Sequence, residues 1–148
     1  MITQQRKTNK WYTTILTLTI LIPIVYVLYL LLMVQNENQS IEELLNTQPI
    51  YVVLLLVSFI NPIWGHFLNQ IPKEARVKKG RGDRFLSLML ISQVVVGNLI
   101  MAFLVFITKR KLPHTSNTQP LTAFEKTVAS ILLVLSLFSG FVLLKLTL

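Results

Sequence analysis

The sequence predicts an all-α integral membrane protein, a single membrane domain (1–148) built as a bundle of four transmembrane helices in two hairpins. Three observations predict this fold. Apolar residues make up 53% of the 148 residues and charged residues only 14%, against about 25% charged in a soluble domain. Four apolar stretches are each long enough to cross a bilayer, which takes about 20 residues. Finally, most Lys and Arg residues gather in the segments between these stretches.

The four predicted spans are 11–34, 49–70, 85–108 and 127–148. The first three contain no Asp, Glu, Lys or Arg, and the fourth contains only Lys145, which lies close enough to the C-terminus to reach the membrane surface. The first span is expected to stay in the mature protein. Its apolar run is longer than the roughly 7–15 residues of a signal peptide, and no small-x-small cleavage site follows it.

The distribution of cations predicts the orientation. Two segments that would share one side of the membrane are rich in Lys and Arg, and cytoplasmic loops carry such an excess. We therefore expect both termini in the cytoplasm (N-in/C-in). The cations of this side are Arg6, Lys7 and Lys10 in the N-terminal tail and Lys73, Arg76, Lys78, Lys79, Arg81 and Arg84 in the loop between the second and third spans.

One cluster disagrees with this orientation. Lys109, Arg110 and Lys111 directly follow the third predicted span and would face outward. Three explanations remain open. The cations favour a helix C-terminus through its dipole, or they face the acidic outer loop that holds Glu37, Glu42 and Glu43, or the third span is re-entrant or the orientation mixed.

Helix-breaking residues fall near the middle of each predicted span. They are Pro23, Pro62, the pair Gly97-Asn98, and Gly140. A proline leaves the carbonyl four residues before it without a partner, and carbonyls freed in this way build substrate or ion sites in transporters with broken helices. The alternative is that these are ordinary kinks, because Gly and Pro are common in membrane helices.

Small and polar residues also recur at helical spacing. Interhelical amide bonds and close contacts between small residues would explain them as packing positions, and a polar site in the middle of the membrane is the alternative. The residues of these predicted stripes are Asn61, Gly65 and Asn69 on the second span, Gln93, Gly97 and Asn98 on the third, and Ser136 and Gly140 on the fourth.

Catalytic and metal-binding chemistry find little support. The spans hold no carboxylate to act as a base, and the sequence lacks the Ser, His and phosphate-loop motifs of common enzymes. His66 is read as a pH sensor or as a residue at the headgroup level. With two histidines and no cysteine, we expect no metal, no cofactor and no enzymatic activity.

The sequence therefore predicts a small polytopic protein that acts by binding another membrane component, in an accessory, regulatory or immunity-type role. The alternative is a subunit of an oligomeric small-solute transporter or channel. The expected partners are another membrane protein or a second copy, together with anionic headgroups at the basic loop. Nucleic acid is not expected, because the cations serve orientation. Composition suggests the cytoplasmic membrane of a bacterium.

Overall fold

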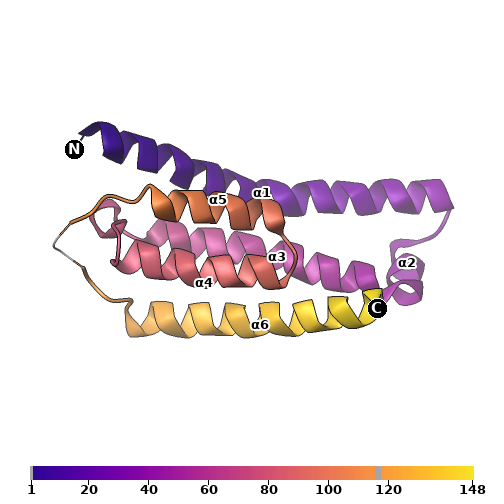
Figure 1. Cartoon of the computed structure of the whole chain (residues 1–148). Helices are drawn as coiled ribbons and strands as arrows, with labels where there is room; N and C mark the ends of the chain where they lie inside the picture. Colours follow the sequence, from indigo (N-terminus) through magenta and orange to yellow (C-terminus); the bar gives the residue numbers. More distant parts are fainter. Residues whose placement is uncertain (1, 116–117) are drawn as a thin grey trace.

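The computed structural model describes residues 2–115 and 118–148, and the described chain is helical apart from short connections (Figure 1). The all-α prediction is confirmed. No strand occurs in this part of the chain. The elements are α1 (Ile2–Glu37), α2 (Ile41–Thr47), α3 (Pro49–Gln70), a 3₁₀ turn η1 (Lys73–Ala75), α4 (Arg81–Val95), α5 (Leu99–Arg110) and α6 (Ala123–Thr147).

Three of the described helices, not four, are long and apolar enough to cross a membrane. They are α1 over Asn9–Glu37, α3 and α6. The expected third span, 85–108, is two helices, α4 of 15 residues and α5 of 12. At 1.5 Å per residue these reach about 22 Å and 18 Å, short of the roughly 30 Å hydrocarbon core of a bilayer.

The chain reverses direction between α4 and α5. Gly97 has φ +74°, a left-handed conformation that glycine adopts without steric cost. Asn98 then caps α5, because its side-chain oxygen accepts a hydrogen bond from the backbone N–H of Met101 at 3.3 Å. Its Nδ2 donates to Oε1 of Gln93 on α4 at 2.8 Å. The Gly-Asn pair expected as a mid-span interruption is therefore the turn of an antiparallel hairpin (Figure 1).

Both ends of this hairpin lie at the same end of the bundle, which we call the basic end. The backbone N–H of Lys78 donates to the carbonyl of Pro113 at 2.9 Å, and Nζ of Lys109 lies 3.6 Å from Oδ1 of Asp83. Residues 109–111 thus sit beside the loop that precedes α4. Every Lys and Arg of the sequence except Lys145 belongs to segments at the basic end.

The opposite end, which we call the far end, carries α2 and three of the six acidic residues, Glu37, Glu42 and Glu43. The N-terminus lies at the basic end and the C-terminus at the far end (Figure 1). The prediction of two hairpins with both termini on one side is therefore not supported, because the termini lie at opposite ends of the bundle. Because α4 and α5 return to their starting end, the chain traverses the bundle three times.

The packed core lies in the half of the bundle that the hairpin fills. Trp64 of α3 packs edge-on against Phe85 of α4, with ring centroids 5.2 Å apart, and both side chains are fully buried. In the other half, large apolar side chains face outward, among them Leu28 of α1 and Leu144 of α6. The hairpin ends partway along α1, α3 and α6, so these helices have no equivalent neighbour toward the far end (Figure 1).

Candidate functional site

A chain of buried hydrogen bonds joins three helices near the middle of the bundle. Nε1 of Trp64 on α3 donates to Oγ of Ser92 on α4 at 3.1 Å. Ser92 also bonds to Oγ of Ser136 on α6 at 2.6 Å. All three residues are fully buried. The sequence does not predict this role of Ser92, because a single serine in an apolar stretch carries no signal of its own.

Two of the three glycines of the predicted stripes, Gly65 and Gly140, lie at close helix contacts. A Cβ atom at Gly140 of α6 would stand 2.6 Å from the carbonyl oxygen of Val95, the last residue of α4. A Cβ atom at Gly65 of α3 would overlap Oγ1 of Thr19 on α1 and stand 2.9 Å from its Cβ. A side chain at Gly140 would push α6 away from the α4 backbone, and one at Gly65 would force the Thr19 side chain or α1 itself to shift.

An open groove of about 410 Å³ lies between α1, α3 and the turn of the hairpin. We call it the tip groove. It brings together two of the predicted polar segments, Asn61 and the pair Gly97-Asn98, although they come from different helices. Its walls include Leu18 and Ile22 of α1 and Ser58 of α3. No charged side chain lines it, so the groove suits a neutral group.

Asn61 is the one polar side chain of the tip groove with an unused hydrogen-bonding atom. The residue is 1% exposed, and its Nδ2 has no hydrogen-bond partner. The other polar groups are already paired. Ser58 donates to the carbonyl of Leu55 at 2.8 Å, and the Tyr26 hydroxyl donates to that of Tyr51 at 3.0 Å. An unpaired buried donor costs about 1–3 kcal/mol. Because Nδ2 is itself buried, an outside group can pair with it only if the side chains that line the groove move aside.

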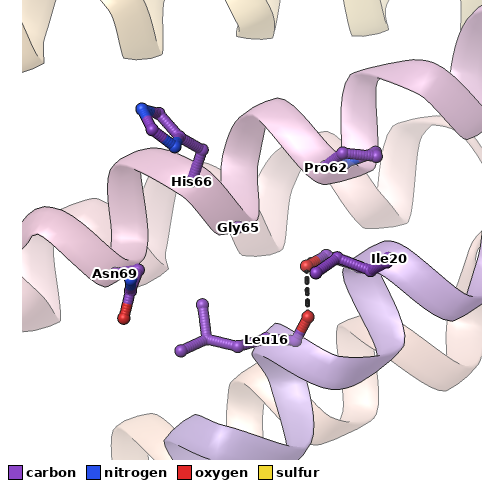
Figure 2. Close-up of a pocket in the computed structure, with 7 residues that line it drawn as sticks. Leu16, Ile20, Pro62, Gly65, His66 and Asn69 are labelled. Carbon is purple, nitrogen blue, oxygen red and sulfur yellow. Dashed lines mark hydrogen bonds between the residues drawn. The ribbon is translucent and has the colours of Figure 1, made fainter.

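The two prolines lie together on a different surface. Pro23 of α1 and Pro62 of α3 line a shallow depression whose other walls are also apolar. It adjoins a pocket of about 420 Å³ between the same helices (Figure 2). We call the two together the seam groove. The depression that both prolines line contains no polar side chain, so the two prolines do not gather a polar site between them.

The remaining polar residues of the second predicted span lie at the basic-end part of the seam groove. Asn69 extends into the space between α1 and α3 (Figure 2). His66 is exposed and turns outward, with Nε2 3.0 Å from the Gln70 amide nitrogen. The predicted stripe Asn61, Gly65 and Asn69 thus meets three surroundings, namely the tip groove, the Thr19 contact and the seam groove.

Several cations of the predicted basic loop hold the structure together. The Arg76 guanidinium lies 4.2 Å from the centre of the Tyr12 ring and donates to the carbonyl of Ile71 at 2.9 Å. Arg81, in the first turn of α4, makes two bonds to the carboxylate of Glu125 in the first turn of α6. These contacts fasten the loop and the hairpin to α1 and α6. Lys73 lies in η1 and Arg84 in α4, and Lys78 and Lys79 form the turn between them.

Neither a metal-binding cluster nor a similar protein points to a further site in the described chain. No group of three His, Asp or Glu side chains within residues 2–115 and 118–148 is arranged to hold a metal ion. No family model, curated protein or solved structure matches the chain. The geometry of the tip groove therefore carries the functional argument.

Replacing a hydrogen-bonded polar residue and replacing an unpaired one should have opposite effects on stability. Ser136→Ala removes a buried bond between α4 and α6 and should lower the free energy of unfolding in detergent by about 0.6–2 kcal/mol. Asn61→Leu removes an unpaired donor from a site of similar size and should leave the melting temperature unchanged or raise it. Thermal unfolding of the two variants beside the parent chain checks this. A loss of stability in Asn61→Leu as large as that in Ser136→Ala would mean that Asn61 is a packing residue.

Proposed function

We propose that this chain is a non-catalytic membrane protein with three transmembrane helices and one re-entrant helical hairpin, and that it acts by binding another membrane protein. The observation that carries the binding role is the unpaired amide of Asn61, which lies buried beneath the surface of the open tip groove. Accessory, regulatory and immunity-type proteins all fit such a role. The chain would then complete its own packing only in the complex.

The charges support an orientation with the basic end in the cytoplasm, hence N-in and C-out. Cytoplasmic segments of membrane proteins carry an excess of Lys and Arg, and only Lys145 lies at the far end. In this topology Lys109, Arg110 and Lys111 face the cytoplasm because the hairpin returns them there. The cluster that contradicts four spans agrees with three spans and a re-entrant hairpin.

We propose that the protein lies in a cell membrane, which composition suggests is the cytoplasmic membrane of a bacterium. Anionic headgroups attract basic segments near the surface by about 1 kcal/mol for each Lys or Arg. The basic end offers such cations on α1, on the loop 71–80 and at the end of α5. We therefore propose anionic lipids as a second class of partner at this end.

The depth of Asn61 supports a protein helix as the occupant of the tip groove. Asn61 lies about 14 Å along α3 from Gln70 and about 18 Å from Pro49, so it sits in the middle of the membrane. The ester oxygens of phospholipids lie at the membrane surface, about 15 Å away, and do not reach it. A transmembrane helix with an amide side chain brings both a donor and an acceptor to this depth.

A subunit of an oligomeric small-solute transporter or channel remains our second proposal. One observation favours it, since the non-helical backbone at Gly97 and Asn98 lies at mid-depth, where such backbone is tolerated only if it is buried in protein or lines a cavity. However, the amide of Asn98 is already bonded to Gln93 and so is not free to bind a solute. Movement of a small solute by purified protein in liposomes would favour this proposal.

The topology predicts which positions a membrane-impermeant thiol reagent labels in intact cells. The sequence has no cysteine, so single cysteines report cleanly. Gln39→Cys and Leu148→Cys at the far end should be labelled. Glu74→Cys and Thr118→Cys at the basic end should be labelled only after the membrane is dissolved. Four spans would instead expose position 118 and protect position 148.

Photo-crosslinking tests the binding role directly. A benzophenone amino acid at Ile100, which is 72% exposed beside the tip groove, should crosslink to one discrete protein under ultraviolet light. The same amino acid at Phe138, which is 63% exposed on α6, is the matched control and should not. Adding Asn61→Leu should reduce the product at position 100 because the partner loses its hydrogen bond.

The mass of the crosslinked product identifies the partner, and twice the mass of this chain indicates a second copy. Adducts with lipid alone at both positions, with no protein product, would contradict the proposed binding role.

A further inference from the structure

The seam groove is a second and separate surface on the α1–α3 pair. The tip groove uses Leu18, Ile22 and Tyr26 of α1, whereas the seam groove uses Ile20, Ile24 and Leu28. Residues two apart on a helix point about 200° apart, so the two grooves open on opposite sides of α1. The hairpin borders the first, and the second faces away from the hairpin.

The two parts of the seam groove form one continuous channel. The part nearest the basic end has a volume of about 420 Å³ and the other about 340 Å³. Both are lined by Ile20 and Pro62, so they meet there. Along α1 the channel extends from Leu16 to Leu28, a distance of about 18 Å.

Polar side chains occur in only one of the two parts of this channel. Its basic-end part carries Thr19, His66 and Asn69, and Asn69 is the second-last residue of α3. The other part is lined only by apolar side chains, such as Pro23, Ile24 and Phe59. The channel is therefore polar at the basic-end surface and apolar toward the middle of the bundle.

Helix contacts give the channel its floor and its walls. The close contact between Gly65 and Thr19 brings α3 against α1, and the compact rings of Pro23 and Pro62 leave space above the contact. Ile20 and Phe59 project from the two helices, 59% and 53% exposed. The depression follows from this arrangement of the two backbones.

We infer that the seam groove binds one phospholipid of the leaflet at the basic end. This inference rests on the membrane location in the proposed function. The polar end lies where ester and phosphate oxygens lie, and these accept hydrogen bonds from the exposed amide of Asn69. The apolar part of the groove, from Ile20 to Leu28, is about 12 Å long, which is most of the half-thickness of the hydrocarbon core, about 15 Å. One acyl chain then extends along Pro62 and Ile24.

The charge of the basic end favours an anionic headgroup. The basic end holds eleven Lys and Arg residues whose side chains are described. A cation near the membrane surface attracts an anionic headgroup over about 8–10 Å without touching it. The bound lipid would cover exposed apolar surface of α1 and α3 and keep the two helices together on the side that the hairpin does not support.

Native mass spectrometry with added phosphatidylglycerol tests this inference. The parent chain in detergent should retain one lipid. Ile20→Trp places a bulky side chain where the two parts of the groove meet and should reduce retention at least tenfold. Ile131→Trp on α6, 55% exposed in the parent chain, is the matched control and should retain the lipid. Asn69→Leu should weaken retention by about tenfold, equivalent to 1.4 kcal/mol.

Ile24→Trp, one turn along α1, is a second filling variant, and melting curves establish that each variant is folded. Equal retention by the Ile20→Trp, Ile24→Trp and Ile131→Trp variants would overturn the inference and leave annular lipid only. That result would not affect the binding role of the tip groove, because photo-crosslinking at Ile100 and cysteine labelling report on other surfaces.

Discussion

The reversal of the chain at Gly97 and Asn98 is the constraint on which the rest of the bundle depends. A left-handed residue followed by a helix cap turns one apolar stretch into two short helices. The bond from Asn98 to Gln93 pairs the polar groups of the turn with each other, which matters because an unpaired group in an apolar surrounding is costly. Pairing these two side chains within the turn lowers the cost of a turn placed midway along the bundle, where Gly97 itself is exposed.

The hairpin of α4 and α5 fills the core along one half of the bundle and leaves the other half without a fourth element. On one half it supplies Phe85, Met89, Met101 and Val105 to the buried core, and ion pairs from Arg81 and Lys109 hold its base. Beyond the turn, α1, α3 and α6 continue without a fourth element. The tip groove and the unpaired Asn61 lie at this boundary. The binding role that we propose rests on this half, in which three helices lack a fourth neighbour.

Much of the helical architecture was predictable from the sequence, because long apolar stretches without charge have few other solutions. The segment 85–108 was not, since its length and composition satisfy the requirements of a span. What distinguishes it is a positive φ at Gly97 and a capping bond at Asn98, which depend on backbone geometry that composition does not reveal. The signal present in the sequence was Lys109, Arg110 and Lys111, whose outward position conflicted with four spans.

The surroundings of the polar residues could not be predicted from the sequence either. Asn61, Gly65 and Asn69 follow at intervals of four, and each such step turns about 40° around the helix. Across eight residues this drift is enough to move Asn61 to one groove and Asn69 to the other. The hydrogen bonds of Ser92 were not predictable for a related reason, because its partners Trp64 and Ser136 come from two other helices.

The depth of successive positions in 85–108 tests the central claim most directly. Spin labels attached to single cysteines in lipid vesicles report depth through their relative contact with oxygen and with a water-soluble nickel complex. A re-entrant hairpin predicts that depth increases from position 85, reaches a maximum near Val96 and Gly97, and decreases again to position 108. A depth that passes through the membrane centre and continues to the opposite surface by position 108 would contradict the account.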